Sequence, residues 1–365
     1  MHISDCYAPR TGGIETQVRS LALAQAEAGH EVHVITATPG HGEVRSGLDT
    51  DGPIAVHRVV ARLPGELPVH PRTRHHVGCL LRGLDADVAH IHTGVISPFA
   101  WGGLRAAAEC DVPRVVTVHS MWGPLSRPGY HATGRLLPWH GTVVTAVSEV
   151  AAEPIARALD REVTVLPNGI DPRAWPATDL PPQPGVLRVV SVARLAPRKR
   201  TGALVDVLSR AALRLDDRVR LRAIIIGDGP QRGRLQRRVV QRGQESVIEL
   251  LGRQEPDRIR QEFARSDVFV QASVRESFGI AALEARTSGL PVIARAQTGA
   301  GEFIEDGVNG LLADDDDGLV DAVCRIGLEP TDLHRMRRFN IAHEPSQTWP
   351  RVLAIASAAY DRAGA

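Results

Sequence analysis

Three cations follow one predicted strand of the chain, at the point where a helix begins. Arg194, Lys199 and either Arg198 or Arg200 closely follow the apolar stretch 187–192. Such a cluster is usually a solvated charged surface, but two positive groups at a helix start also suit a diphosphate, through charge-assisted hydrogen bonds and the helix dipole. Lys199 is the only lysine among 43 basic residues, which indicates that this position needs a compact ammonium rather than a planar guanidinium.

Two carboxylates lie around the start of a later predicted helix. Glu276 follows the strand predicted at 268–271, and Glu284 is expected about two turns into the next helix. Ser277 is predicted as the N-cap, and Gly279 would let a ligand approach backbone N–H groups. Carboxylates at two depths suit a ligand with two sets of hydroxyls, such as a sugar and a ribose. The alternative is a surface role for Glu284 and a helix-dipole role for Glu276.

Two glycine-containing segments and one histidine complete the candidate set. Gly227-Asp228-Gly229-Pro230 follows a predicted strand and is either a simple turn or a ligand-binding loop. Gly12 and Gly13 lie in a loop that opens the first helix, a weak signal for phosphate binding because neither a G-x-G-x-x-G nor a Walker sequence is present. His119 comes directly after a predicted strand and is expected to face the ligand.

Patterns with metal-ligand spacing are present, but none of them predicts a metal site. Asp49-Thr50-Asp51 is expected in a polar loop, and Asp85-Ala86-Asp87 at the amino end of a strand, which is the wrong end for a ligand. His90 and His92 have the spacing that places two strand residues on one face. The four cysteines form no C-x-x-C pair and are expected to be reduced thiols.

The elements that must position these residues alternate between strands and helices, which predicts mostly parallel sheets covered on both faces. In the first half, strands are expected at 32–36, 54–60, 88–92, 114–119, 143–146 and 163–166, with helices at 15–28 and 100–109. In the second half, strands are expected at 187–192, 221–226, 248–251, 268–271 and 291–294, and helices at 204–212, 233–242, 259–265 and 280–288.

The chain is therefore predicted to form two doubly wound α/β domains. Residues 1–170 form the first domain, 171–186 a linker with five prolines, 187–345 the second domain, and 346–365 a final helix. Ligands of such sheets bind outside the carboxyl ends of the strands. With two sheets facing each other, the site is expected in the cleft between them.

Composition excludes several classes of protein. Among 365 residues, 43% are hydrophobic and 23% charged, which is typical of a folded chain. The formal net charge of +1 argues against a nucleic-acid partner. Apolar runs fall far short of the roughly 20 residues that span a bilayer, and the first residues lack the pattern of a signal peptide. A cytoplasmic location is therefore expected.

Seven segments, taken in order, resemble motifs of the retaining glycosyltransferases of family four, over nearly the whole chain. The resemblance implies the GT-B architecture: two Rossmann-like domains facing a central cleft, with the last helix crossing back onto the N-terminal domain. The matching segments are Gly12-Gly13-Ile14, His119, Pro167–Asp171, Arg194 with Lys199, Gly227–Pro230, Glu276–Glu284 and Gly307–Leu312.

The family resemblance also implies roles for the candidate residues. The donor would be a nucleotide-diphosphate sugar, its diphosphate held by Arg194 and Lys199 with help from backbone N–H groups near Gly12 and Gly13. Glu284 would bind the ribose hydroxyls, and His119 would lie near the reactive face of the sugar. The donor sugar itself would be bound by Glu276 together with the segment Ser277, Phe278, Gly279 and Ile280. The catalytic set is then Arg194, Lys199, Glu276 and His119.

The same resemblance implies transfer of a hexosyl-type group to a small-molecule, glycan or natural-product hydroxyl, with retention and without metal or cofactor. Since the sequence offers no protein nucleophile, the implied route is a front-face one, in which the leaving phosphate takes the acceptor's proton. The stretch Thr298–Glu302 departs from the two glycines and glutamate common in the family, which leaves the donor open.

The acceptor is also open, because the loops expected to shape it, 39–52, 61–74 and 121–138, match no known pattern. Trp122, Tyr130, His131 and Trp139 in or beside the last loop could stack on a sugar or cyclitol ring. The alternatives are a nucleotide-sugar epimerase on the same architecture, a non-catalytic binding protein, and a membrane-surface glycosyltransferase with a lipid acceptor, which the basic segment 70–82 would favour.

Overall fold

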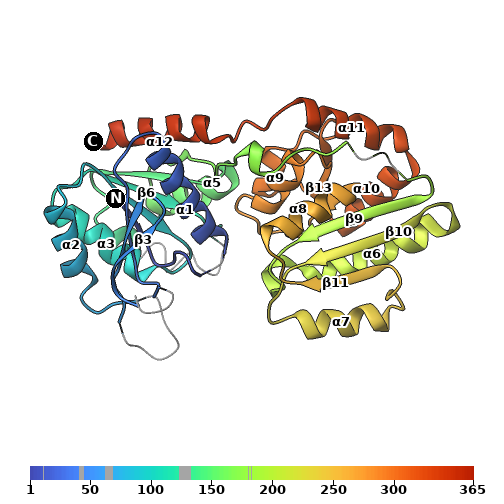
Figure 1. The fold of residues 1–365 in the computed structure, drawn as a ribbon, viewed down its shortest axis with the longest axis horizontal. Helices are drawn as coiled ribbons and strands as arrows, with labels where there is room; N and C mark the ends of the chain where they lie inside the picture. Colours follow the sequence, from blue (N-terminus) through green and yellow to red (C-terminus); the bar gives the residue numbers. More distant parts are fainter. Residues whose placement is uncertain (11, 41–44, 62–68, 123–132, 180, 182) are drawn as a thin grey trace. The chain divides into compact units, whose positions relative to one another are not determined.

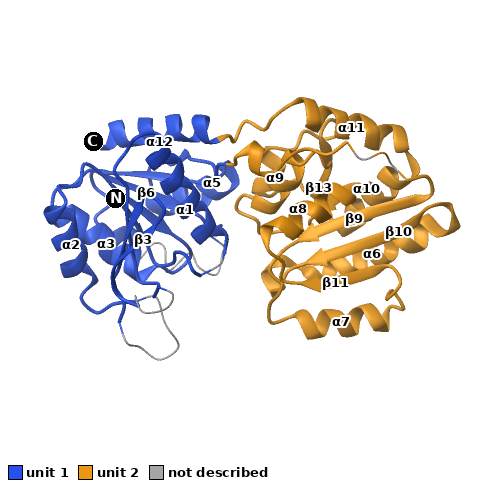
Figure 2. Ribbon diagram, in the orientation of Figure 1, with its two compact units in different colours: residues 1–169, 349–365 blue, residues 170–348 orange. Residues whose placement is uncertain are grey.

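A computed structural model describes residues 1–10, 12–40, 45–61, 69–122, 133–179, 181 and 183–365. Contacts divide the chain into two compact units (Figure 2). Unit 1 comprises Met1–Gly169 together with Trp349–Ala365, and unit 2 comprises Ile170–Thr348. The last helix of the chain therefore belongs with the N-terminal sheet.

Unit 1 is built on an eight-stranded sheet in the order β3-β4-β2-β1-β5-β6-β7-β8 (Figure 1). All neighbouring strands are parallel except β3 and β4. The chain starts in the middle of the sheet and builds outward in both directions, so β1 and β5 flank its topological switch point. The strands are β1 His2–Ser4, β2 His33–Thr36, β3 Gly47–Asp51, β4 Ile54–Arg58, β5 Ala89–Thr93, β6 Arg114–Val118, β7 Thr142–Ala146 and β8 Thr164–Val165.

The helices of unit 1 cover this sheet. They are α1 Gly13–Glu27, α2 Thr73–Gly83, α3 Pro98–Glu109, α5 Glu149–Leu159 and α12 Trp349–Ala363. Helix α12 contacts α1 and strands β6 and β7, and its Val352 and Ala356 form a buried cluster with Leu166. Gly169 makes this docking possible, because a Cβ there would lie 2.4 Å from the Trp349 ring.

Unit 2 is built on six parallel strands in the order β11-β10-β9-β12-β13-β14. The strands are β9 Val186–Val192, β10 Arg220–Ile226, β11 Ile248–Gly252, β12 Val268–Val270, β13 Val292–Arg295 and β14 Gly310–Ala313. The helices are α6 Thr201–Leu215, α7 Arg232–Gln241, α8 Pro256–Arg265, α9 Ile280–Thr287, α10 Asp316–Leu328 and α11 Pro330–Ala342. The switch point lies between β9 and β12, with β10 and β11 on one side and β13 and β14 on the other.

The core of unit 2 explains why its strands read as continuous apolar runs. Val189 and Ile225 on neighbouring strands pack with Leu208 of α6 and Val323 of α10, all of them at most 1% exposed. The proline-rich segment before β9 also belongs to this unit, because Trp175 is buried with its ring centroid 5.6 Å from that of Phe263. Parallel strands buried on both faces need apolar side chains in both directions.

The predicted fold class is confirmed, and the expected strands lie within a few residues of the observed ones. One expectation about the strands was wrong, since Asp49 and Asp51 lie in strand β3 rather than in a polar loop. This edge strand pairs antiparallel with β4 and is stabilised by ion pairs, since Asp49 binds Arg58 at 2.7 Å and Asp51 binds Arg19 at 2.6 Å. Charged side chains hide such a strand from a search for apolar alternation.

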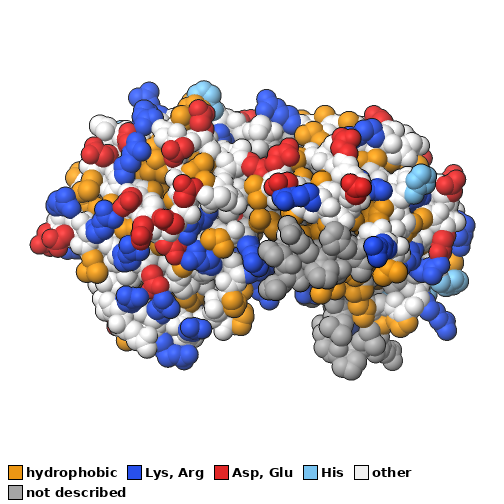
Figure 3. All heavy atoms as spheres, turned by 180° about the vertical axis from the view of Figure 1, so that it is seen from behind, with side chains coloured by type: hydrophobic (Ala, Val, Ile, Leu, Met, Phe, Trp, Pro, Cys, Tyr) orange, Lys and Arg blue, Asp and Glu red, His pale blue; other side chains and the backbone are white. Residues whose placement is uncertain are grey.

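The loops expected to shape an acceptor pocket are described only in part, since 41–44, 62–68 and 123–132, which include Tyr130 and His131, lie outside the described residues. Trp139 is only 6% exposed and its indole N–H donates to the Thr133 carbonyl at 2.9 Å, so a stacking role for this ring was a wrong expectation. On the face drawn in Figure 3, acidic and basic side chains are interspersed rather than gathered by sign. Among the described residues, no helix combines the length and apolarity needed to cross a membrane.

Candidate functional site

Two of the residues predicted from the sequence, Lys199 and Glu276, meet at the switch point of unit 2. Strands β9 and β12 are neighbours, so the loops that leave their carboxyl ends lie side by side. The loop after β9 carries Arg194 and Lys199, and the loop after β12 carries Glu276. In open α/β sheets this crevice is where ligands bind.

Lys199 and Glu276 form an ion pair across this point. Lys199 ends the 3₁₀ turn Pro197–Lys199, and its Nζ donates to Glu276 Oε2. The Lys199 side chain is 20% exposed and that of Glu276 is 11% exposed. An ammonium has three donors and a carboxylate about four acceptor sites, so both groups keep hydrogen-bonding capacity for a ligand. The structure thus brings together two residues that the sequence separates by half a domain.

Arg194 is the exposed member of the group. None of the described residues forms a hydrogen bond or ion pair with its guanidinium, and its side chain is solvent-exposed. Its five N–H donors can therefore reach an anion without breaking an existing contact. An exposed guanidinium and a half-buried ammonium on one loop suit the two phosphates of a diphosphate.

The loop carrying Arg194 is held by Gly227 and Gly229, which follow β10. A Cβ on Gly227 would lie 1.9 Å from the Ala193 carbonyl oxygen, and one on Gly229 would lie 2.5 Å from that of Leu195. Both glycines also have positive φ, at 138° and 154°. The Gly-Asp-Gly-Pro motif therefore lets two backbones touch, which places the loop after β9.

The loop after β12 leads into α9 in a way that corrects two predictions. Gly279, with φ of 95°, precedes the helix as its N-cap, so Ser277 is not the N-cap. Glu284 is the fifth residue of α9, about one turn in rather than two. Phe278 is buried against Phe303 with ring centroids 5.6 Å apart, and Ile280 is the first residue of the helix.

The divergent stretch Thr298–Glu302 packs directly against this loop. Gly299 N donates to the Glu276 carbonyl at 2.8 Å, and a Cβ on Gly299 would lie 2.3 Å from the Ser277 carbonyl oxygen. Ala300 would be 2.9 Å from a Cβ placed on Gly279. The departure from the family pattern therefore lies in the wall behind the predicted donor loop.

Glu284 has an unusual electrostatic environment. Burial raises the pKa of its carboxyl to about 8, an effect that the charge of Arg260 only partly opposes. No described residue donates a hydrogen bond to this carboxylate. A carboxyl with unspent acceptor capacity suits a ligand that supplies hydroxyl donors, and such donors would lower its pKa again.

Replacing Glu284 by glutamine should flatten the pH dependence of stability. In the unfolded chain the carboxyl ionises near its ordinary pKa of 4.5, but in the fold its pKa is about 8. Between these values the folded state retains a proton that the unfolded state has lost, so stability falls as pH rises. Because the group is half-buried, we expect a Glu284→Gln gain of about 1–2 kcal/mol at pH 8 and none at pH 4.5.

Urea unfolding at the two pH values measures this gain, with the exposed Glu245→Gln as control. An equal effect of Glu284→Gln at pH 4.5 and pH 8 would contradict the raised pKa.

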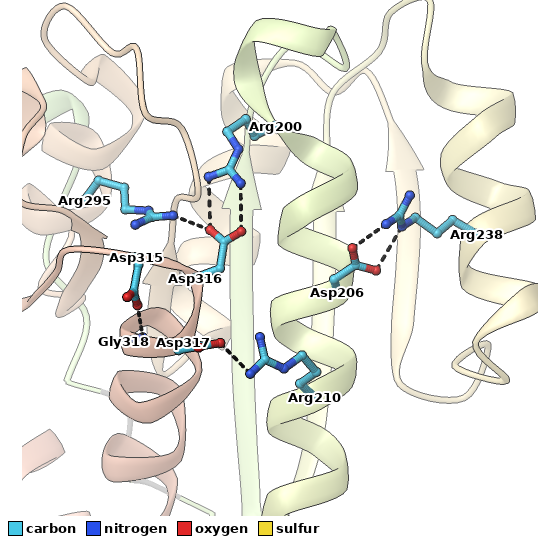
Figure 4. A network of polar contacts seen from close by, with 9 residues as sticks. All are labelled: Arg200, Asp206, Arg210, Arg238, Arg295, Asp315, Asp316, Asp317 and Gly318. Carbon is cyan, nitrogen blue, oxygen red and sulfur yellow. Dashed lines mark hydrogen bonds and ion pairs between the residues drawn. The ribbon is translucent and has the colours of Figure 1, made fainter.

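Arg200, the residue after Lys199, is held by a network of ion pairs (Figure 4). It adopts a left-handed conformation with φ of 50°. Its guanidinium donates to both carboxylate oxygens of Asp316 at 3.0 and 2.7 Å, and Arg295 donates to Asp316 as well. Burial opposes ionisation of Asp316, but these two guanidiniums lower its pKa. The network ties the Lys199 turn to β13 and α10.

Removing the Asp316 carboxylate should both destabilise unit 2 and weaken anion binding at Lys199. Asp316→Asn would leave Arg295, which is 5% exposed, without its charge partner. We expect a loss of about 1–3 kcal/mol in unfolding free energy, and a severalfold loss of nucleoside-diphosphate affinity in calorimetric titration.

Asp317→Asn is the matched control for this prediction, because the next residue pairs with Arg210 while 74% exposed. It should cost less than about 0.5 kcal/mol. Equal effects of the two substitutions would show that Asp316 does not position the Lys199 turn.

Sequence reasoning missed this network. Within the acidic run 314–317, Asp315 caps α10 and accepts from Gly318 N at 2.8 Å (Figure 4). Asp316 carries no separate signal in the sequence. The left-handed conformation of Arg200 and its contact with Asp316 appear only in the structure.

Two further motifs that matched the family have structural roles in this chain. Asn309 is buried, and its Oδ1 accepts from Glu305 N at 2.9 Å in the turn that leads into β14. Gly310 opens that strand where a Cβ would lie 2.2 Å from the Val292 carbonyl oxygen. Gly169 accommodates Trp349, as described above. These positions shape the fold.

Unit 1 carries the remaining predicted residues. His119 follows β6, its N donates to the Thr93 carbonyl at 2.8 Å, and burial lowers its pKa to about 4. The ring lines a cavity of about 20 Å³ together with Asn168 and Trp349. Gly12 and Gly13 are exposed at the N-terminus of α1, where Thr16 N binds the Gly12 carbonyl at 3.1 Å. Their backbone N–H groups lie at a helix start, as anion binding requires.

Comparison with protein families matches both halves of the chain. Residues 11–174 match the family described as Glycosyltransferase Family 4, and residues 179–342 match Glycosyl transferases group 1. A GDP-mannose-dependent alpha-mannosyltransferase of Mycobacterium tuberculosis is 27% identical over 96% of this chain and 93% of that protein. An alpha-monoglucosyldiacylglycerol synthase of Acholeplasma laidlawii is 26% identical over 90% of this chain and 87% of that protein.

The fold also matches solved structures. Anabaena Alr3699/HepE, crystallised with UDP, aligns with a TM-score of 0.72 over 98% of both chains at 18% sequence identity. At this level of identity the similarity establishes the architecture of the chain.

Proposed function

Because this chain belongs to the group 1 glycosyltransferases and has the GT-B fold, we propose that it transfers a hexosyl-type group from a nucleotide-diphosphate sugar to an acceptor hydroxyl, with retention of configuration. The acceptor would be a small molecule, a glycan or a natural product. The observation that carries this proposal is the Lys199–Glu276 pair at the switch point of unit 2, with Arg194 exposed on the same loop.

Each candidate site residue of unit 2 has a distinct proposed role. Arg194 and Lys199 bind the two phosphates, and Glu276 accepts hydrogen bonds from the sugar hydroxyls together with the Phe278–Ile280 backbone. Glu284 accepts from the ribose. Gly12, Gly13 and His119 of unit 1 remain predictions for donor contacts. A relative that is GDP-mannose-dependent and a similar fold crystallised with UDP support a nucleotide donor, and leave its base and sugar to experiment.

The chemistry follows from these charges. The bond from the anomeric carbon to the β-phosphate oxygen breaks through an oxocarbenium-like transition state, and negative charge grows on the departing diphosphate. Fixed cations there stabilise the transition state more than the ground state. The acceptor oxygen then bonds to the same face of the anomeric carbon, and its proton passes to the leaving phosphate. Two protein cations at the diphosphate support a metal-independent reaction.

A thermal-shift screen with UDP-, GDP-, ADP- and dTDP-sugars tests this proposal. One nucleotide series should raise the melting temperature, and the matching donor should release its nucleoside diphosphate faster when an acceptor is present. NMR of the product should show the anomeric configuration of the donor. Conversion of the donor to an epimer without acceptor would identify an epimerase instead, and no shift with any donor would overturn the proposal.

A lipid acceptor is the second candidate, favoured by one observation on unit 1. Helix α2 exposes Arg74, His75 and His76, and a relative is a diacylglycerol glycolipid synthase. Flotation with vesicles of anionic lipid tests this directly. Binding that is lost at high salt would support the lipid acceptor, and a protein that stays at the bottom of the gradient would exclude it.

A further inference from the structure

Unit 1 contains a buried chain of hydrogen bonds that ends at His119 and that the proposed chemistry does not use. His119 Nε2 lies 3.1 Å from His92 Nδ1, and His92 Nε2 lies 2.9 Å from His2 Nδ1. His2 Nε2 lies 2.6 Å from Gln25 Oε1, and Gln25 Nε2 donates to the Tyr360 hydroxyl at 2.8 Å. The five residues come from β1, α1, β5, the end of β6 and α12, so the chain runs from the last helix to the candidate site.

The chain has one direction. The Oε1 atom of Gln25 can only accept, so His2 must carry its proton on Nε2. Burial lowers the pKa of His2 to about 3, and it lowers that of His92 well below its ordinary value, so each ring is neutral with a single N–H. His2 Nδ1 therefore accepts from His92 Nε2, and His92 Nδ1 accepts from His119 Nε2.

The consequence for His119 is a fixed tautomer. Its Nε2 carries the proton and donates it to His92, which leaves Nδ1 as the acceptor nitrogen of the ring. The partner of one ring nitrogen commonly decides which tautomer the other presents.

A second branch leaves Tyr360 without reaching His119. The Tyr360 hydroxyl lies 2.8 Å from His90 Nδ1, and His90 Nε2 lies 2.6 Å from Thr117 Oγ1. Thr117 Oγ1 lies 2.7 Å from Thr145 Oγ1, and the Thr145 hydroxyl donates to the Val116 carbonyl. This branch is as buried as the first, so it provides variants that break a buried hydrogen bond without touching the tautomer of His119.

A metal ion is the competing interpretation of the same cluster. One ring nitrogen from each of His2, His90 and His92 lies within 4.8 Å of the others. However, all six nitrogens of these rings already have a hydrogen-bond partner at 2.6–3.1 Å. Ligation would break at least two of these bonds in a buried site, so the geometry favours the chain of hydrogen bonds.

We propose that Tyr360, Gln25, His2 and His92 are positioning residues that hold His119 as its Nε2–H tautomer, with Nδ1 as the acceptor nitrogen of the ring. The effect on activity rests on the proposed function, whereas the tautomer does not. The last helix of the chain thereby acts on the candidate site through side chains that never touch a substrate.

Long-range ¹H–¹⁵N NMR of histidine-labelled protein tests the tautomer without any substrate. We expect the His119 signals of a neutral ring protonated on Nε2. In His92→Leu, His119 should become a mixture of its two neutral tautomers. In the control Thr145→Val, the Nε2–H tautomer of His119 should persist. The proposal would be overturned if His119 of the wild type were protonated on Nδ1, or if its signals were unchanged in His92→Leu. It would also be overturned if one equivalent of zinc shifted the signals of His2, His90 and His92.

Steady-state kinetics of the same variants provide a second test of the proposal. In His92→Leu and Gln25→Leu, kcat/KM should fall about tenfold below that of Thr145→Val, and Gln25→Glu should restore most of it because a carboxylate also accepts from His2. Equal kcat/KM in His92→Leu and Thr145→Val would overturn the positioning role. If the wild-type protein transfers no sugar, the proposed function fails while the NMR result still decides the tautomer.

Discussion

Replacing Lys199 by alanine should lower the rate of glycosyl transfer by about 10²–10³, because removing one preorganised donor from a developing anion typically costs this much. The ammonium is the partly buried cation of the loop after β9, and it is oriented by Glu276. Affinity for the nucleoside diphosphate should also fall, by about tenfold or more for a lost charge-assisted bond. Initial-rate kinetics and calorimetric titration measure the two effects.

Two comparisons give this result its meaning. Lys199→Arg should restore only part of the rate, since a guanidinium keeps the charge but not the compact geometry of the ammonium. Arg210→Ala, which removes an exposed cation from helix α6, should leave the rate unchanged. Normal turnover by Lys199→Ala would refute the role of this residue.

Replacing Glu276 by alanine should lower transfer by a similar factor but affect binding differently. The proposed role of this carboxylate is to accept from the donor sugar, so a nucleoside diphosphate without sugar should bind the variant at least as tightly as it binds the wild type. Loss of Glu276 also releases the Lys199 ammonium from its partner. Glu276→Gln, which keeps an acceptor oxygen but loses the charge, should lie between alanine and wild type in rate.

The double variant Lys199→Ala/Glu276→Ala separates the sugar contact from simple orientation of the lysine. Independent contacts with the donor predict that the two losses nearly add, apart from the energy of the ion pair itself. If Glu276→Ala weakens nucleoside-diphosphate binding as much as Lys199→Ala does, then Glu276 acts only by holding the lysine. Circular dichroism of each variant confirms that the fold persists.

The sequence predicted the sheets because their strands are buried on both faces and read as uninterrupted apolar runs. It also placed Lys199 and Glu276 each after a strand of one parallel sheet, and the structure shows that the two side chains meet. The edge strand β3 was not predicted, because its aspartates are paired with Arg58 and Arg19 rather than buried beside apolar neighbours.

Local features that depend on backbone angles were less predictable. Ser277 has the side chain of an N-cap, but Gly279 ends the loop because only a residue tolerant of positive φ fits there. That shift of two residues brings Glu284 about half a turn closer to the start of its helix. The glycines after β10 were open to two interpretations, and only the distance to the Ala193 carbonyl shows why a side chain is excluded.

Contacts between distant segments were beyond sequence reasoning altogether. Asp316 binds Arg200 from 116 positions away, and the histidine chain joins the first strand to the last helix. His90 and His92 were correctly expected on one face of a strand. Their partners on α1, β1 and α12 are set by tertiary packing, which a single sequence does not encode in any local pattern.

A crystal structure of the protein with the nucleoside diphosphate of its preferred donor tests the central claim most directly. Phosphate oxygens should lie within hydrogen-bonding distance of Lys199 Nζ and the Arg194 guanidinium, beyond the ends of β9 and β12. A nucleotide bound at another edge of the sheet, or one whose phosphates leave both side chains untouched, would contradict the account.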